Sequence, residues 1–389
     1  ITDRLYGGGG EYRLLQELLL GMGGVKALRA YARINGKPAP AVYHTNEGHA
    51  GFLGIERIQE LMEKGLSWEQ SLAAVRASTL FTTHTPVPAG IDRFDKDLIR
   101  HFFTGPLAPA VPTEELLKLG AEDYAGGNGS VYNMAVMGLR LAQRANGVSK
   151  LHGNVSRGMF AGLWPNFDHQ EVPITSVTNG VHEPTWVAPE IVDFAAKTLG
   201  MDAVIESDWS RVGDIAEKDL WDLKRTLRRT LITDARARLR KSWSERGAGE
   251  AELGWIDEAL DENVMTIGFA RRVPTYKRLT LMLRDPQRLR AMLTDPERPI
   301  QLIIAGKSHP ADEQGKKMIQ ELVQFTDDPE VRKRIVFLPN YDMRMAHTLF
   351  PGCDVWLNNP LRPFEACGTS GMKAALNGGL NLSILDGWW

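Results

Sequence analysis

Short runs of aliphatic and β-branched residues alternate with segments of helical periodicity between residues 264 and 385. This alternation predicts a series of strand–helix–strand units, and therefore a parallel sheet with helices on both faces. Right-handed crossovers place the strand-to-helix loops at one edge of such a sheet, where ligands bind. We expect strands at 264–269, 301–305, 335–338, 354–357 and 380–385, and helices at 279–293, 313–325, 343–350 and 372–376.

The first half of the chain shows the same alternation less completely. Ser67 opens a helix, with Gln70 in the capping-box position. Apolar residues at helical spacing predict the buried stripe of a later helix, namely Met134, Met137, Leu141 and Ala145. We expect strands at 41–45 and 80–83, a helix at 51–64, and a further strand that begins near residue 173.

The two halves together predict an α/β protein with two doubly wound, Rossmann-like domains that face each other across a cleft. A loop follows the strand near residue 173, so we place the domain boundary there and expect domains at 1–177 and 178–389. The chain starts inside an amphipathic pattern and stops at a strand-like run. We therefore expect a fragment in which each domain is incomplete.

The charge balance, the hydropathy and the cysteine content argue against several classes of protein. Lys and Arg number 46 and Asp and Glu number 48, so the chain lacks the basic field on which nucleic-acid binding depends. No apolar run approaches the roughly 20 residues of a membrane-spanning helix, and the first residues do not form a signal peptide. Cys353 and Cys367 are too few for a disulfide framework, which predicts reduced thiols in a cytoplasmic protein.

A basic helix opens the second half, and its apolar stripe holds Leu220, Leu223, Leu227 and Leu231. Its other positions carry many cations, which predict a solvated face rather than a nucleic-acid surface. These cations are Lys224, Arg225, Arg228, Arg229, Arg236 and Arg238.

Basic residues also occur in the loops that follow the strands of the second half. Arg272 and Lys277 flank a turn that contains Pro274, and the loop 306–310 follows the next strand. Free amides and the positive dipole ends of helices meet at this edge, which suits an anion. A guanidinium with a nearby ammonium can clamp a phosphate, and the strand-end placement favours this role over ordinary surface charge.

The segment 44–49 collects polar side chains at the end of a predicted strand. Glu47 separates two histidines without the i, i+4 spacing of a zinc helix, so we expect no metal site. Its donors and acceptors suit hydroxyl groups of a ligand, and the alternative is a simple strand-end turn. His84 also ends a strand, either as a contact residue or as a satisfied core histidine.

The segment 365–379 places Lys373 in an apolar helix, between Met372 and Ala374. Desolvation there would lower the pKa of its amine and suit it to a Schiff base. The alternative is a lysine that snorkels to the surface. The preceding residues 368–371 have the character of a glycine-rich, anion-binding loop.

At these segments the chain resembles the α-glucan phosphorylases, the glycogen and maltodextrin phosphorylase family, and most of all its bacterial branch. The resemblance covers nearly the whole chain, and it is most specific at 365–378, which is similar to the family's pyridoxal phosphate motif. It implies the two-domain GT-B architecture of glycosyltransferases. It also implies that Lys373 binds pyridoxal 5′-phosphate.

The resemblance implies further roles, position by position. Thr369 and Arg271 match positions that hold the cofactor phosphate, and Tyr341 matches the tyrosine beside the pyridine ring. Arg272 and Lys277 match the residues that bind the substrate phosphate.

His84 matches the position whose backbone and ring face the transferred glucose. The remaining matches lie on or beside the sugar site, at Asn179, Glu365, Gly368, Glu47 and His49.

The implied reaction is reversible phosphorolysis, in which inorganic phosphate and an α-1,4-glucan give glucose 1-phosphate with retention. Two phosphates held together need cations to offset their repulsion, and no pair of glycosidase carboxylates is required. The family analogy also implies a homodimer. Two alternatives are a nucleotide-sugar glycosyltransferase on the same scaffold and a non-catalytic glucan-binding fragment. The chain departs from the family pattern at residues 7–10 and at 370–371.

Overall fold

The computed structural model describes residues 9–272, 275–308 and 312–389. The chain divides into two compact units. Unit 1 comprises residues 1–179, 363–367 and 386–388, and unit 2 comprises 180–362, 368–385 and 389. The first division therefore lies just past residue 177, and two short stretches near the end of the chain belong with the first unit.

Unit 1 contains a parallel sheet in the order β1-β2-β5-β6. Its strands are β1 (Tyr43–Asn46), β2 (Thr79–Thr82), β5 (Arg144–Gly147) and β6 (Ile174–Ser176). The strands expected near 41–45, 80–83 and 173 are confirmed, although β1 begins later than expected. A second, antiparallel pair consists of β3 (Arg93–Asp95) and β4 (Val131–Asn133).

The helices of unit 1 surround these strands. They are α1 (Gly10–Leu18), α2 (Gly24–Ile34), α3 (Phe52–Glu63), α4 (Trp68–Ala77), α5 (Lys96–Phe103), α6 (Thr113–Leu119), α7 (Met134–Arg140) and α8 (Lys150–Met159). A π-helical turn, η1 (Leu19–Gly23), joins α1 to α2, and shorter 3-10 turns are η2 (Gly48–Ala50), η3 (Pro88–Gly90) and η4 (Ala161–Leu163). The capping box of α4 is confirmed, because Ser67 and Gln70 exchange side-chain-to-backbone hydrogen bonds.

The helix expected through Ala145 ends earlier in the structure. α7 stops at Arg140, and Ala145 lies in β5, where its register partners are Phe81 and Ile174. The expectation was wrong because a short apolar run suits a buried strand as well as a helix, and only the neighbouring strands decide between them.

Unit 2 contains a parallel sheet in the order β11-β10-β7-β8-β9. All five strands expected in this half are confirmed, as β7 (Met265–Arg272), β8 (Ile300–Lys307), β9 (Ile335–Pro339), β10 (Val355–Asn358) and β11 (Leu380–Ser383). Its helices are α9 (Glu183–Trp186), α10 (Pro189–Leu199), α11 (Met201–Glu206), α12 (Glu217–Glu245), α13 (Glu250–Leu253), α14 (Pro286–Thr294), α15 (Glu313–Thr326), α16 (Met343–Gly352) and α17 (Thr369–Leu376). Four 3-10 segments are η5 (Val212–Asp214), η6 (Gly254–Glu258), η7 (Thr275–Lys277) and η8 (Leu279–Arg284).

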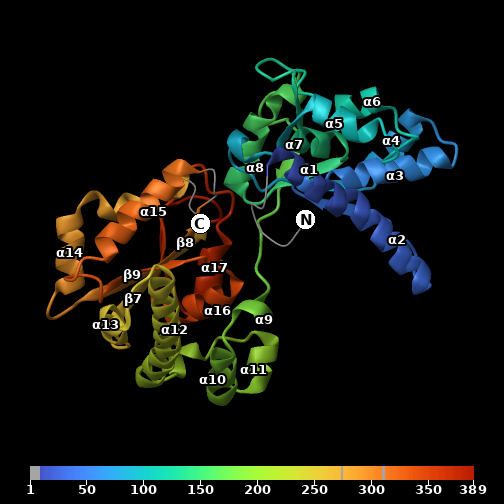
Figure 1. Ribbon diagram of the computed structural model, residues 1–389. Helices are drawn as coiled ribbons and strands as arrows, with labels where there is room; N and C mark the ends of the chain where they lie inside the picture. Colours follow the sequence, from blue (N-terminus) through green and yellow to red (C-terminus); the bar gives the residue numbers. More distant parts are fainter. Residues whose placement is uncertain (1–8, 273–274, 309–311) are drawn as a thin grey trace. The chain divides into compact units, whose positions relative to one another are not determined.

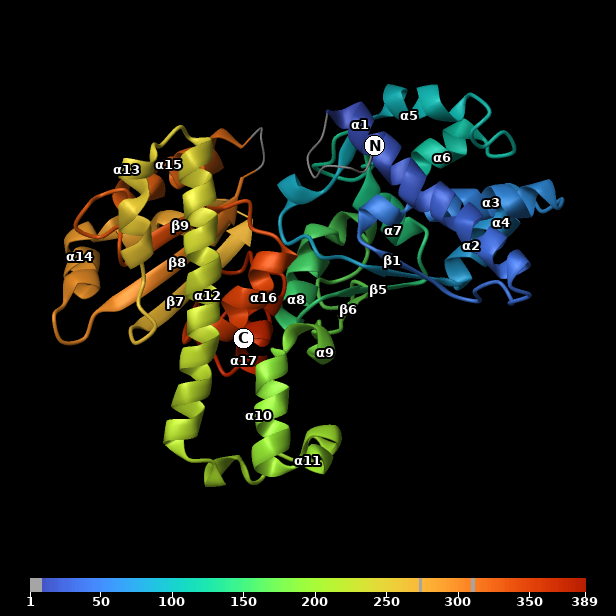
Figure 2. The same cartoon turned by 60° about the horizontal axis from the view of Figure 1, so that its bottom comes forward.

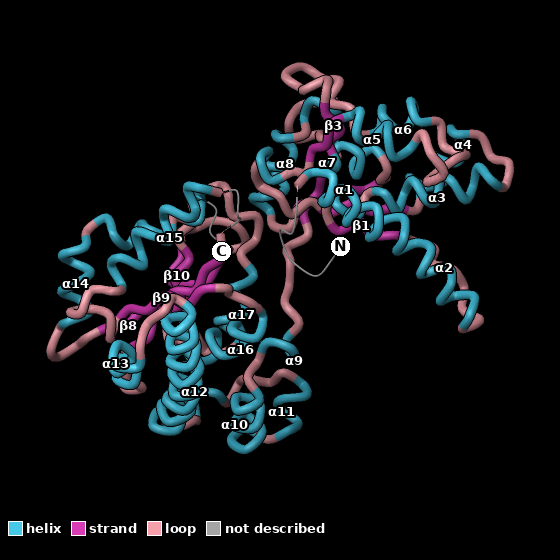
Figure 3. Tube along the Cα trace, in the orientation of Figure 1, coloured by secondary structure: helices cyan, strands magenta, loops and turns pink. Residues whose placement is uncertain are grey.

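Alternate residues of the central strands enter two different cores, because side chains of a strand point to opposite faces in turn. Ile303 and Ala305 of β8 join a cluster with α12 and α16. Leu302 and Ile304 join a cluster with α14 and α15. Figures 1 and 3 show the strands between these two groups of helices, so the sheet of unit 2 is covered on both faces.

Two of the expected helices have different bounds. The helix expected at 279–293 is interrupted, because Pro286 has no backbone N–H to donate and starts a new helix, α14. Asp285 caps that helix by accepting a hydrogen bond from the Arg288 amide at 3.0 Å. The second difference concerns the helix expected at 372–376. It is α17 in the structure and begins at Thr369, so residues 369–371 of the expected loop form its first turn.

The basic helix is α12, and the expectation of a solvated cationic face is wrong at two positions. The Arg228 side chain is 1% exposed and pairs with Asp354. Lys224 Nζ donates to the carbonyl oxygens of Pro351 at 2.7 Å and Cys353 at 3.0 Å. Both cations therefore attach α12 to the end of α16 and to the start of β10, and Figure 2 shows α12 beside α16.

Cys353 and Cys367 are both buried and are not joined in a disulfide. Among the described residues, no helix combines the length and the apolar character needed to cross a bilayer.

Candidate functional site

The residues singled out from the sequence fall into two groups, one in each unit. Unit 2 holds Arg271, Arg272, Lys277, Tyr341, Gly368, Thr369 and Lys373. Unit 1 holds Glu47, His49, His84, Asn179 and Glu365.

The unit 2 group lies around the topological switch point of its sheet. β7 and β10 are neighbours, yet the helices that follow them, α14 and α17, pack on opposite faces. Ligands of open α/β sheets bind at the carboxyl ends of such a strand pair. Arg271 and Arg272 end β7, and Asn358 ends β10.

Lys373 projects from α17 toward an aromatic surface. Its Nζ lies 3.8 Å from the ring centroid of Trp186 and 5.9 Å from that of Phe350. The Trp186 ring stacks on His347 at 4.9 Å and meets Phe350 edge-on at 5.7 Å. Burial lowers the pKa of the Lys373 amine, as the sequence predicted, which increases the fraction of nucleophilic neutral amine.

Arg271 lies at the end of β7, and Tyr341 lies in the turn between β9 and α16, close enough for its phenol to respond to the Arg271 charge. Arg271 is buried, and its guanidinium lies 5.6 Å from the centre of the Phe269 ring. Burial raises the pKa of Tyr341 to about 12, while the positive charge of Arg271 acts in the opposite direction. Tyr341 therefore stays a neutral phenol next to a permanent cation.

Lys277 ends the short turn η7, and its Nζ lies 4.9 Å from the ring centre of Tyr276. This turn is attached to the segment after β10. The Tyr276 carbonyl accepts from the Leu361 amide at 2.8 Å, and Arg278 donates to the carbonyl of Asn359 at 2.8 Å. Parts of the expected anion loops lie outside the described structure. These are the side chain of Arg272 and the residues Pro274 and His309.

The first turn of α17 presents small polar residues at the same edge. Gly368 caps the helix with a φ of 84°, a left-handed conformation that glycine adopts without strain. Thr369 is the first helical residue. Ser370 Oγ and Asn359 Oδ1 are buried with no hydrogen-bond partner among the described residues. Buried polar atoms of this kind are expected where a ligand completes a site.

In unit 1, Glu47 connects the ends of β1 and β2. Its carboxylate accepts hydrogen bonds from the Gly48 amide at 3.0 Å, the His84 amide at 2.7 Å and the Thr85 hydroxyl at 2.9 Å. Its φ of 82° is strained for a residue with a side chain, and these bonds hold it in place. Glu47 thus orients the loop that carries His84.

His84 and His49 are held as neutral imidazoles. His84 Nε2 pairs with Asn46 Oδ1. Burial lowers the pKa of His84, and the charge of Glu47 opposes this shift in part. Burial also lowers the pKa of His49, and the positive charge of Arg13 lowers it further. Neutral rings can donate and accept at the same time, which suits hydroxyl groups.

Asn179 and Glu365 belong to the same unit. The Asn179 amide donates to the Val148 carbonyl at 3.1 Å. Glu365 is 5% exposed, and its amide donates to the Asp386 carboxylate at 3.1 Å. The Ser149 hydroxyl, just after β5, donates to the Ala366 carbonyl at 2.7 Å. The stretch from Glu365 to Cys367 is therefore attached to the sheet edge of unit 1.

The structure adds His152, which the sequence analysis did not single out. The Val148 amide donates to its Nδ1 at 3.2 Å, so Nε2 carries the hydrogen and donates to the Thr85 carbonyl at 3.2 Å. His152 is fully buried next to the loop of His84. A usable signal was present, because Ser149 lies two residues after the end of β5 and caps the helix that holds His152.

Trp186 was also missed. It lies far from Lys373 in sequence, and nothing in the pattern around it marks it as a neighbour of that lysine.

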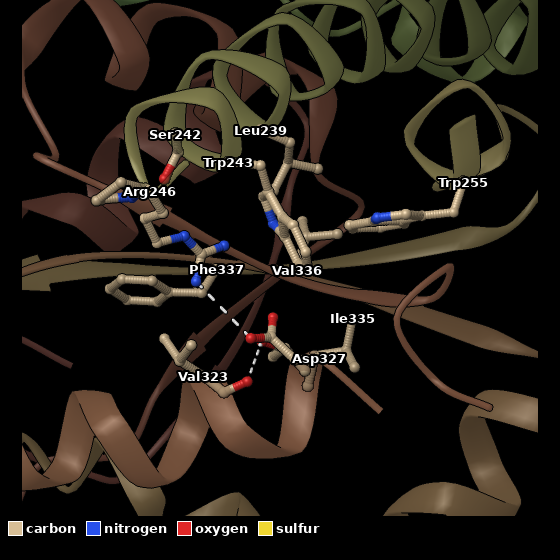
Figure 4. Close-up of a pocket in the computed structure, with 12 residues that line it drawn as sticks. Leu239, Ser242, Trp243, Arg246, Trp255, Val323, Asp327, Ile335, Val336 and Phe337 are labelled. Carbon is tan, nitrogen blue, oxygen red and sulfur yellow. Dashed lines mark hydrogen bonds and ion pairs between the residues drawn. The ribbon is translucent and has the colours of Figure 1, made fainter. Parts of the chain in front are cut away.

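A separate hollow in unit 2 contains none of these residues. It is a cavity of about 130 Å³ beside β9, lined by Trp243 and Trp255 among others. Figure 4 shows the Arg246 guanidinium directed at the Asp327 carboxylate, 3.7 Å away. Burial raises the pKa of Asp327. The candidate site is therefore the strand-end edge and not this hollow.

Comparison with known proteins agrees with the motif at α17. The family model for carbohydrate phosphorylases matches residues 122–388. The chain belongs to this family. Phosphorylases of known name resemble it along its whole length: a glycogen phosphorylase of Mycobacterium tuberculosis is 60% identical over 398 residues. A maltodextrin phosphorylase of Thermococcus litoralis is 42% identical, and a glycogen phosphorylase of Aquifex aeolicus is 40% identical.

These phosphorylases are longer than the chain. All of the chain is matched in each case, but it covers 46%, 45% and 56% of the three relatives. The chain thus spans about half the length of the phosphorylases that it matches.

Proposed function

We propose that the chain is the part of an α-glucan phosphorylase that carries the cofactor lysine and much of the sugar site. The reaction is reversible phosphorolysis of an α-1,4-glucan, which gives glucose 1-phosphate with retention. The observation that carries the proposal is Lys373, a desolvated amine on α17, the helix that follows β10 at the switch point of a phosphorylase-family sheet.

The residues at this edge fit pyridoxal 5′-phosphate. Lys373 offers a nucleophilic amine, and the Ser370 hydroxyl is buried without a partner among the described residues. Arg271 and Thr369 would hold the phosphate of the cofactor, and Tyr341 would pack beside its ring. When bound, the cofactor supplies a phosphate group that can exchange a proton with the substrate phosphate.

Arg272 and Lys277 would bind the substrate phosphate. Two phosphates in close proximity repel each other, and cations at the end of β7 and in η7 would offset that repulsion. The substrate phosphate gives its proton to the glycosidic oxygen as that bond breaks, and a phosphate oxygen then bonds to the same face of the sugar carbon.

The unit 1 group would bind the glucose unit. Glu47 fixes the His84 loop through three hydrogen bonds, so the histidine keeps one orientation when the sugar arrives. His84 and His49 offer donors and acceptors to hydroxyl groups, and Asn179 and Glu365 would supply further sugar contacts. Gly368 of unit 2 would add another.

We also propose the larger arrangement that the family resemblance implies. Residues 1–177 would form the sugar-side domain and 178–389 the cofactor- and phosphate-binding domain of a GT-B enzyme, with the cleft between them as active site. A homodimer and a location in the cytoplasm belong to the same proposal.

The test is made on the full-length protein supplied with pyridoxal 5′-phosphate, maltodextrin and inorganic phosphate. We expect glucose 1-phosphate to form, and we expect Lys373→Ala to abolish it. Lys218→Ala is the matched control, because Lys218 is an exposed lysine whose partner is Asp222 on the same helix.

Three outcomes would contradict the proposal. The first is no glucose 1-phosphate from the wild-type protein. The second is glucan binding without turnover, which would support the non-catalytic alternative. The third is sugar transfer from a nucleotide sugar that Lys373→Ala leaves intact, which would support the glycosyltransferase.

A further inference from the structure

Asn377 lies at the end of α17 and is fully buried. Its Nδ2 donates to the Trp186 carbonyl at 2.7 Å and to the Lys373 carbonyl at 2.8 Å. Its Oδ1 accepts from the Ala188 amide at 2.9 Å. One side chain therefore joins the backbone of the Lys373 helix to the connection between α9 and α10.

Trp186 depends on such an attachment. It ends α9, a helix of four residues, and so short a helix does not hold its own orientation. Its ring has contacts with His347, Phe350 and Lys373, all of which come from other elements. The hydrogen bonds of Asn377 fix the backbone on both sides of Val187, directly after this ring.

The same attachment reaches a third element. The Asn377 carbonyl accepts from Lys224 Nζ of α12 at 3.4 Å. α17, α12 and the α9–α10 connection thus meet at Asn377, which caps the helix of Lys373 and lies four residues after it.

We propose that Asn377 is a positioning residue that holds the Trp186 ring against the Lys373 side chain and thereby sets how readily that amine reacts with the cofactor aldehyde. The inference rests on the proposed function, since it takes Lys373 as the cofactor lysine. Asn377 itself touches neither the Nζ atom nor, in the proposed site, the cofactor. Its effect passes through Trp186.

The readout is reductive pyridoxylation of the full-length, cofactor-free protein at one pH. The Lys373 nitrogen bonds to the aldehyde carbon of pyridoxal 5′-phosphate, and the aldehyde oxygen leaves as water with two amine hydrogens. Borohydride then delivers a hydride to that carbon. Peptide mass spectrometry gives the rate of adduct formation at Lys373.

Asn381→Ala is the matched control. Asn381 Nδ2 also donates to a backbone carbonyl of α17, that of Gly371 at 3.0 Å, but it reaches the helix from β11 and not from the α9–α10 connection. We expect Asn377→Ala to slow labelling of Lys373 by roughly tenfold, as loss of an orienting partner does elsewhere. We expect Asn381→Ala to label at nearly the wild-type rate.

Thermal unfolding of each variant separates positioning from general stability. If Asn377→Ala does not fold, Asn377→Asp takes its place in the experiment. The aspartate keeps an oxygen that accepts from the Ala188 amide, but it has no NH₂ group to donate to the Trp186 carbonyl. Trp186→Leu provides a measurement that does not depend on Asn377. It should slow labelling, and adding Asn377→Ala to it should cause little further loss, because residues that act in series are not additive.

Wild-type labelling rates in a folded Asn377→Ala or Asn377→Asp variant, or in Trp186→Leu, would overturn the inference and leave the proposed function intact. Fully multiplicative effects in the double variant would also overturn it. Failure of the wild-type protein to label at Lys373 would instead contradict the proposed function.

Discussion

Lys373 Nζ lies 3.8 Å from the ring centroid of Trp186, so an indole face replaces part of the water that would surround the ammonium. The ring attracts the cation, but the loss of hydration favours the neutral amine. Burial accordingly lowers the pKa of Lys373. An amine of this kind is nucleophilic at a pH where ordinary lysines are still protonated.

We therefore expect Lys373 to react with acetic anhydride at lower pH than Lys218 in the cofactor-free protein. The hydrogen bond from Lys218 to Asp222 raises the pKa of that exposed lysine. The two lysines are acetylated briefly across a pH series, and labelling is quantified peptide by peptide. The result for each lysine is a midpoint, the pH at which its labelling is half-maximal. Coincident midpoints, or a higher midpoint for Lys373, would show that its amine is not activated.

The sequence predicted the positions of most strands along the chain well, because each strand is a short, buried apolar run between turn signals. It failed where the deciding partner is distant in sequence. Arg228 looked like a surface cation, but its partner Asp354 is 126 residues away. Ala145 looked helical, and only its register partners in β2 and β6 reveal a strand.

The candidate site shows the same limit. Lys373 was predicted from its own helix, because its apolar neighbours imply desolvation. Trp186 and Asn377 were not, because the hydrogen bond that joins them spans 191 residues. Glu47 was predicted as a ligand for hydroxyl groups, but the structure shows its carboxylate accepting from its own loops. Its proposed role is therefore to position His84.

The buried Arg228–Asp354 pair predicts a large stability effect. Asp354 also accepts from the Thr266 amide at 2.8 Å, so the pair anchors the start of β10 to α12 and β7. Arg228→Met should lower the free energy of unfolding by about 3 kcal/mol, because it leaves a largely buried carboxylate without its cation. Arg229→Met is the control on the same helix, since Arg229 is exposed and pairs with Glu262. Equal urea midpoints for the two variants would contradict this role.

Glu47 should be sensitive even to an isosteric change. In Glu47→Gln one carboxylate oxygen becomes an NH₂ group that cannot accept from the amide or hydroxyl donors around it. We expect a loss of about 1–3 kcal/mol in urea unfolding, the cost of unsatisfied buried groups. Glu47→Ala should lose at least as much, since all three bonds disappear. Wild-type midpoints for both variants would mean that other contacts hold the His84 loop.

Glu17 on α1 gives a prediction about pH. Its side chain is 1% exposed, and Arg13 Nε lies 3.0 Å from its Oε1. Burial, and to a lesser extent the nearby Asp92, raise its pKa from the ordinary value of 4.5 to about 9, although Arg13 acts in the opposite direction. The folded protein therefore keeps this proton up to about pH 9, whereas an unfolded chain loses it near pH 4.5.

Between those two values the folded state binds more protons than the unfolded state, so stability falls as pH rises, by at most about 1.4 kcal/mol per pH unit. Glu17→Gln removes this titration while keeping the shape of the side chain. Urea unfolding at pH 6 and pH 8 should show the variant gaining stability relative to the wild type as pH rises. Glu11→Gln, an exposed change on the same helix, should follow the wild type. A constant difference between Glu17→Gln and the wild type would mean that Glu17 is already ionised at pH 6, with Arg13 as its partner.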